Sequence, residues 1–147
     1  MPCLLKVFKE LNNFIEKMES EEKPMLVIGD FNFCFRDQPS NPTKSFLIRK
    51  SYQQLIYEPT HLDGHILDQA YIKDPSKALQ WTTELHSKYY SDHKALAITI
   101  KKVIEPVAFE NILMFYYLDN NSSGRRIVRN KDNQSLNITM ETNLLFF

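Results

Sequence analysis

The feature that most limits the possible folds is a short apolar run from Met25 to Ile28, which ends at Gly29 and Asp30. An uninterrupted apolar run of this length is typical of a strand buried on both faces, whereas a strand with one wet face alternates. The acid stands at the end of the run, where the chain turns towards solvent. The sequence therefore predicts an interior strand with a carboxylate at its exit.

The residues before this run predict an amphipathic helix. Apolar residues recur every three or four positions from Leu4 to Met18, with Lys and Glu between them, which is the spacing of one helix face. The polar SEEK segment and Pro24 then end the helix.

Polar segments separate the apolar ones further along the chain. Residues 37–44 hold two prolines among polar residues and indicate a loop. The later patterns predict a short helix at 46–55 and strands at 66–72, 81–85 and 94–103.

The character of the chain changes after Val103. Glu105 and Pro106 break the last expected strand, and an apolar segment, an NNSSG turn, a basic RRIVRNK patch and a terminal LLFF follow. These segments fit no clear element. We therefore expect a domain over residues 1–103 and an extension over 104–147 that is disordered or lies outside the domain.

Composition says more about the size and cellular compartment of the protein than about its function. The 147 residues suit one domain. Because 18 basic and 18 acidic residues balance, the chain could bind nucleic acid only through a local basic patch. The two cysteines, Cys3 and Cys34, form no metal-spaced pair and suit a reducing compartment. Lys6 and Lys9 interrupt any signal-peptide core, and no stretch reaches the ~18–20 apolar residues of a membrane span. We expect an intracellular protein without a membrane partner.

Three polar clusters border the expected strands. They are Asp30 with Asn32, Thr60-His61 with Asp68, and Ser91-Asp92-His93. Carboxylates at strand ends can converge on one edge of a sheet, where their oxygens suit a hard divalent cation such as Mg²⁺.

Each cluster also has a plainer interpretation. An Asp-x-Asn after a strand is commonly an Asx turn, and a single Ser-Asp-His is often a cap. His61, His65 and His86 can be ordinary surface or loop histidines, which is what we expect of His61 and His86.

In combination and in this order, the segments LVIGDFN, PTHLDGHILDQAYI and YYSDHKALAI resemble the endonuclease/exonuclease/phosphatase superfamily of DNase I-like enzymes. The resemblance covers residues 4–103 and is nearest to retroelement-type or apurinic-type endonucleases. It implies an α/β (α+β) fold, namely half of a four-layer αββα sandwich, with one mainly antiparallel or mixed sheet and flanking helices.

The resemblance also implies catalytic roles. Asp30 would align and deprotonate the attacking water, while Asn32 would hydrogen-bond the phosphate. His93 would donate to a phosphate oxygen, with its ring fixed by Asp68. Asp92 would help to hold Mg²⁺, or Mn²⁺ in its place, which offsets negative charge.

Further implied features concern completeness. Thr60 and Ser91 would contact the substrate phosphate or support residues that do. The superfamily also carries an upstream metal-binding Glu in a strand–turn–strand context, and no Glu among residues 1–29 has that context. We therefore expect a weak or inactive enzyme unless it pairs with the missing N-terminal half or a second chain.

The expected function is Mg²⁺-dependent phosphodiester hydrolysis by an endonuclease whose partner is DNA. Two alternatives stay open: an inactive remnant that acts as an interaction module, and a phosphoinositide- or sphingomyelin-type phosphatase of the same superfamily. Basic residues could line a groove for the DNA backbone, although an ordinary solvated face is the plainer interpretation. They are Arg36, Lys44, Arg49 and Lys50.

Overall fold

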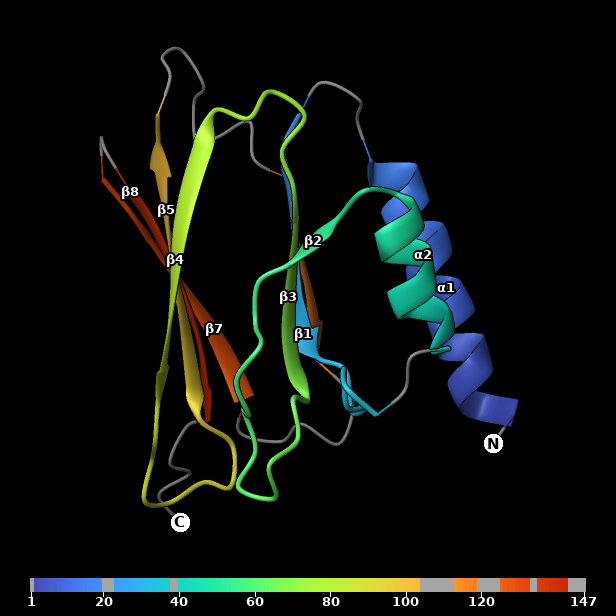
Figure 1. Cartoon of the computed structure of the whole chain (residues 1–147), viewed down its shortest axis with the longest axis vertical. Helices are drawn as coiled ribbons and strands as arrows, with labels where there is room; N and C mark the ends of the chain where they lie inside the picture. The colour runs from blue at the N-terminus through green and yellow to red at the C-terminus, as the bar shows by residue number, and fades with distance from the viewer. Residues whose placement is uncertain are drawn as a thin grey trace.

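The chain folds into three layers. A computed structural model describes residues 2–19, 23–37, 40–103, 113–118, 125–132 and 135–142. Two helices cover one face of a first sheet, and a second sheet covers the other face (Figure 1). In chain order the elements are α1 (Pro2–Met18), β1 (Met25–Asp30), α2 (Pro42–Arg49), β2 (Gln53–Gln54), β3 (Asp68–Lys73), β4 (Leu79–His86), β5 (Ala95–Lys102), β6 (Leu113–Leu118), β7 (Arg125–Lys131) and β8 (Ser135–Thr142).

The two sheets differ in direction. The first has the order β2-β3-β1-β6 and is mixed, because β1 runs antiparallel to β3 and parallel to β6. The second has the order β4-β5-β8-β7 and is antiparallel throughout. This architecture confirms the expected α+β class and its sandwich-like layers.

Strand β1 is the interior strand that the apolar run predicts, and all six of its residues are buried. Successive side chains of a strand point to opposite faces. Leu26 and Ile28 join the core between the two sheets, whereas Met25 and Val27 join the core beneath the helices.

The helices follow the sequence in part. Helix α1 packs Phe8, Leu11 and Ile15 into the core beneath it, as its periodicity predicts. Helix α2 begins earlier than expected, because the Asn41 side chain accepts from two backbone N–H groups of its first turn and Pro42 occupies the first position. The predictions of a loop to residue 44 and a helix at 46–55 were therefore wrong in their bounds. Neither described helix has the length and apolar character to cross a membrane.

The described residues of 104–147 contradict the expectation of an extension outside the domain. Strands β6, β7 and β8 pair with β1 and β5 or with each other, so these residues belong to the two sheets and are not an extension outside the domain. The physical reason is alternation along β8, where Leu136, Ile138 and Met140 are completely buried. The remaining residues of 104–147 lie outside the described ones.

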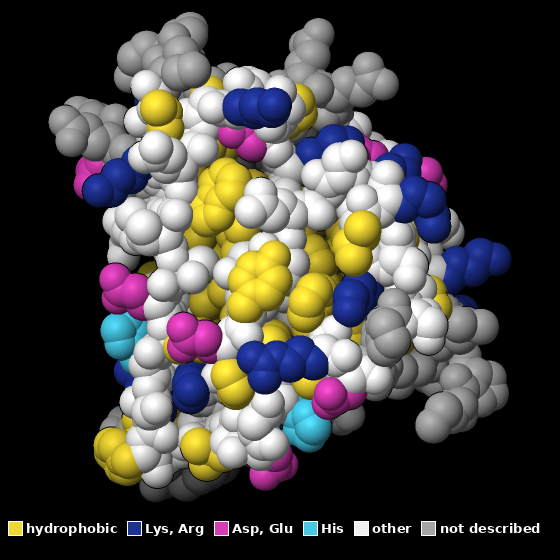
Figure 2. Space-filling view, viewed as in Figure 1, with side chains coloured by type: hydrophobic (Ala, Val, Ile, Leu, Met, Phe, Trp, Pro, Cys, Tyr) yellow, Lys and Arg dark blue, Asp and Glu magenta, His cyan; other side chains and the backbone are white. Residues whose placement is uncertain are grey.

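The same strands correct the expected number of sheets, which is two and not one. The first sheet buries its inner face against β4, β5 and β8 of its own chain. Where the edge strands β2 and β4 face each other, hydrophobic side chains show at the surface (Figure 2). A groove at this edge is lined by Leu55, Ile56, Tyr57, Glu58, Thr83 and Leu85.

Candidate active site

Two carboxylates meet at one end of the first sheet. Asp30 is the last residue of β1 and Asp68 is the first of β3, and the two stand directly opposite each other. Both share the strand face of Ile28 and Ala70, which line the core between the sheets. Asp30 is 3% exposed and Asp68 is fully buried.

His93 reaches these acids from the second sheet, since it lies two residues before β5. Its Nδ1 is 2.8 Å from Oδ2 of Asp68, and its Nε2 is 3.9 Å from Oδ2 of Asp30. The expected contact between Asp68 and His93 is therefore present. An oxygen beside His93 and Asp30 can lie ~2.8 Å from both atoms, within hydrogen-bond distance of each.

Asn32 completes the first cluster through its backbone. Its N–H donates to Oδ1 of Asp30 at 3.1 Å, and its φ of 53° lies in the left-handed region that Asn tolerates. The plainer Asx-turn interpretation is thus present in the structure. The turn uses one oxygen of Asp30, while the other oxygen faces His93.

Thr60 and Ser91 support the site from behind. The fully buried hydroxyl of Thr60 accepts from the N–H groups of Leu67 and Asp68, both at 3.0 Å. The hydroxyl of Ser91 accepts from the N–H of His93 at 3.1 Å. Of the two roles considered for them, this placement favours support of the site's backbone.

His61 joins the site although its sequence suggested an ordinary loop histidine. Its Nε2 is 3.2 Å from Oδ2 of Asp92, and its ring meets the ring of His93 edge-on at 4.9 Å between centroids. An isolated antiparallel bridge pairs the two histidines. No local spacing could reveal this contact, because it joins residues 32 positions apart in the sequence.

Asp92 lies at the solvent side, with 66% of its side chain exposed. Partial burial would raise its pKa, but the hydrogen bond with His61 and the charge of His93 outweigh that effect, so the pKa of Asp92 is lowered. The carboxylate of Asp92 is therefore available as a negatively charged ligand for a cation. Ligand atoms of Asp92, His61 and His93 lie within 4.8 Å of one another, as do those of Asp30, Asp68 and His93.

The basic residues considered for DNA binding mostly make contacts within the protein. Arg36 donates to the carbonyl of Tyr57 at 2.6 Å, and Lys44 donates to that of Phe35 at 2.7 Å. Lys50 pairs with Glu16 at 3.1 Å. These contacts favour the plainer interpretation.

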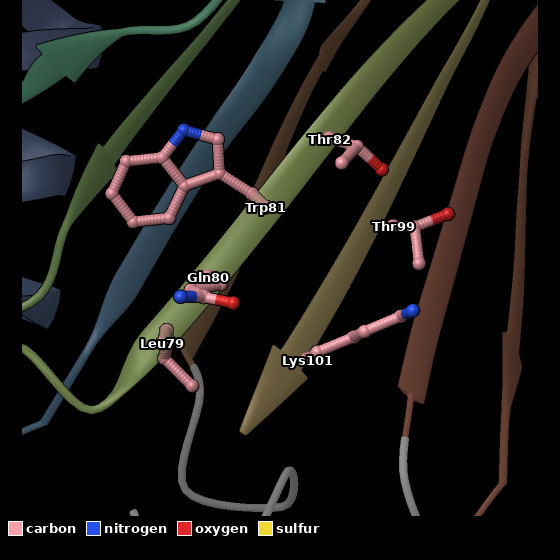
Figure 3. Close-up of a pocket in the computed structure, with 6 residues that line it drawn as sticks. All are labelled: Leu79, Gln80, Trp81, Thr82, Thr99 and Lys101. Carbon is pink, nitrogen blue, oxygen red and sulfur yellow. The ribbon is translucent and has the colours of Figure 1, made fainter. Parts of the chain in front are cut away.

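A separate pocket lies on the second sheet. Trp81 projects towards the first sheet, whereas Thr82, Thr99 and Lys101 project to the other side of β4 and β5 (Figure 3). Lys101 follows His93 by eight residues, or roughly 26 Å of extended chain. This pocket is therefore not part of the candidate active site.

Comparisons with known proteins do not identify a family for the chain. Neither the protein-family models nor the curated proteins nor the solved structures contain a match to it. The functional interpretation thus depends on the site itself and on the sequence resemblance.

Proposed function

We propose that this site hydrolyses phosphodiesters, with DNA as the substrate and a divalent cation as the cofactor. The observation that carries the proposal is the position of His93 between Asp68 and Asp30. An imidazole held by one carboxylate and facing a second is suited to donate to a phosphate oxygen while the second carboxylate holds a water.

The proposed roles are those that the resemblance implies, and the positions of the residues support them. Asp68 orients the His93 ring and stabilises its charged form, which donates from Nε2 to a phosphate oxygen. Oδ2 of Asp30, the oxygen that faces His93, accepts a proton from water placed beside that phosphate. Asn32 is held next to Asp30 by the Asx turn, where its amide can contact the same phosphate.

The donor chemistry fits a weakly held cation. Mg²⁺ commonly takes one or two protein carboxylates and completes its shell with waters and substrate oxygens. Asp92 supplies an exposed carboxylate beside His93, and Mn²⁺ would use the neighbouring imidazole of His61 more readily than Mg²⁺ would. The bound ion would offset negative charge on the phosphate.

The choice of DNA depends on the resemblance to retroelement-type and apurinic-type endonucleases, because the described side chains around the site do not identify the polymer. An intracellular setting agrees with the DNA substrate and with the free, buried Cys34.

The test is nicking of supercoiled plasmid by the full chain with Mg²⁺, with Mn²⁺ and with EDTA. Asp30→Asn keeps the size of the side chain and its turn-forming oxygen but removes the charge. Because no Glu among residues 1–29 has the context of the superfamily's metal ligand, we expect weak metal-dependent nicking, which falls at least ~10²-fold further in Asp30→Asn.

Glu84→Gln is the matched control, because Glu84 lies beside His86 at 3.2 Å on β4 and has no part in the site. It should retain the full rate. Absence of nicking by the folded chain, or full nicking by Asp30→Asn, would contradict the proposal.

A further inference from the structure

A second cluster of ligand-type side chains lies on two loops next to the candidate active site. Cys34 and Asp37 come from the loop after β1, and His65 comes from the loop before β3. One ligand atom from each lies within 4.8 Å of the other two. We propose that these residues form a site for a thiolate-binding divalent cation, for which Zn²⁺ is the best fit.

The distances agree with tetrahedral coordination. Bonds of ~2.0–2.3 Å from zinc place neighbouring ligand atoms ~3.3–3.7 Å apart. Nδ1 of His65 is already 3.1 Å from Oδ2 of Asp37. The side chains of His65 and Asp37 are 47% and 59% exposed, so they can rotate onto an ion without movement of the buried Cys34.

The donor types favour zinc over magnesium. Thiolate and imidazole are ligands for zinc, whereas magnesium prefers oxygen. Cys34 is free of any disulfide and buried. The ion replaces the thiol proton, which leaves to solvent. One thiolate and one carboxylate then balance the two positive charges, so the cluster around the buried sulfur is neutral.

The Cys34 thiol, the Asp37 carboxylate and the His65 imidazole each bring one ligand atom within 4.8 Å of the other two. The three side chains supply three ligands and leave a fourth position for water, as in zinc sites that are open to solvent.

The backbone holds the two loops together before any ion binds. Phe35 donates its N–H to the carbonyl of Ile66 at 3.2 Å, and Phe31 donates its N–H to the carbonyl of Leu67 at 2.9 Å. Gly64 makes the turn before His65 with a φ of +84°, which glycine adopts without strain. Less chain ordering is then needed on binding, since the ligands already stand on paired segments.

The position of the site suggests what the ion does. The loop after β1 follows Asp30, and the loop before β3 leads into Asp68. A bound ion would cross-link the two segments that present these carboxylates. The site is separate from the proposed phosphodiesterase chemistry and does not depend on it.

The experiment titrates the purified full chain with Co²⁺, followed by displacement with Zn²⁺. We expect a thiolate-to-cobalt charge-transfer band that saturates at one ion per chain and that Zn²⁺ abolishes. Cys34→Ser should remove the band, and Asp37→Asn or His65→Gln should each weaken Zn²⁺ binding at least ~10-fold. Unfolding temperature should rise with Zn²⁺ in the parent chain and not in these variants.

Three control variants exclude other ligands. Cys3→Ser removes the other thiol, His86→Gln removes a histidine with a carboxylate at a similar 3.2 Å but no thiol, and His61→Gln disrupts the cluster around Asp92. All three should keep the cobalt band. Absence of a band in the parent chain, or binding that follows His61 and survives His65→Gln and Asp37→Asn, would overturn the proposal. These two variants change half-exposed side chains, so folding does not decide the result.

Discussion

Asp30 and Asp68 are direct cross-strand partners in the antiparallel pair of β1 and β3. Like charges in this arrangement repel and destabilise a sheet, and here both residues are buried. The His93 ring lies between them, with one nitrogen towards each carboxylate. His93, which precedes β5 of the second sheet, thus offsets the repulsion between the two acids of the first sheet. The packing of the two sheets against each other assembles the site.

Asp68→Asn tests this relationship. The amide cannot stabilise a charged His93 as the carboxylate does, although it can still hold the ring by a neutral hydrogen bond. We expect plasmid nicking to fall at least ~10²-fold while the far-ultraviolet circular dichroism spectrum is unchanged. Glu84→Gln changes a carboxylate beside another histidine and should leave the rate unaltered. Equal rates for Asp68→Asn and the parent would show that His93 needs no charged partner.

Asn32→Gly separates the side-chain amide from the backbone turn. Glycine adopts the φ of 53° at this position freely and keeps the N–H that donates to Asp30. We expect stability to change by less than ~1 kcal/mol, whereas nicking falls at least ~10-fold if the amide contacts phosphate. Urea unfolding and nicking assays on the same samples separate the two effects. Unchanged nicking would show that Asn32 contributes only through its backbone turn.

Thr60→Val examines the backbone support of Asp68. Valine has nearly the shape of threonine, but it leaves the N–H groups of Leu67 and Asp68 without their buried acceptor. At about 1–3 kcal/mol for each unsatisfied group, we expect the free energy of unfolding to fall by about 2–6 kcal/mol. Thr60→Ser keeps the acceptor and should cost about 1 kcal/mol for the lost methyl group. Urea unfolding measures both, and equal losses would contradict the assigned role.

How far the sequence predicts this molecule depends on the range of the contacts. Local patterns predicted α1 from its periodicity and β1 from its apolar run, because each pattern reports one element's own surroundings. The start of α2 was also readable, since Asn41 and Pro42 are a cap and a first-turn residue, but the prolines were interpreted as a loop. The alternation of Leu136, Ile138 and Met140 was a usable strand signal as well.

Other features depend on pairing between distant segments. Strand β6 runs parallel to β1 although 88 residues separate their paired positions, which no local period encodes. His61 reaches the site only because its segment pairs with that of His93. Asp30, Asp68 and His93 were expected together through the resemblance, and their convergence could not have been derived from spacing alone.

Ile138→Ala tests whether the described tail is part of the core. Ile138 is fully buried between the sheets and stands opposite Ile98. Its truncation should lower the free energy of unfolding by about 2–5 kcal/mol, whereas Thr139→Ala, on the opposite face of β8, should cost less than ~1 kcal/mol. Urea unfolding of both variants provides the comparison, provided that the free energy of unfolding depends on urea concentration with the same slope in each. Similar small effects for both variants would place β8 outside the cooperative core.

The lowered pKa of Asp92 gives stability a defined dependence on pH. A carboxyl group whose pKa is lower in the folded than in the unfolded chain binds fewer protons when folded. Its contribution is fully present above the ordinary value of 3.8 and is lost as pH falls through the lower folded value. We therefore expect Asp92→Asn to be less stable than the parent at neutral pH, with the difference shrinking only below about pH 4. Urea unfolding as a function of pH measures this difference.

In a His61→Gln background the loss of stability caused by Asp92→Asn should be smaller, because the hydrogen bond that lowers the pKa of Asp92 is already gone. A difference that persists unchanged to low pH would show that Asp92 stabilises the fold without its charge.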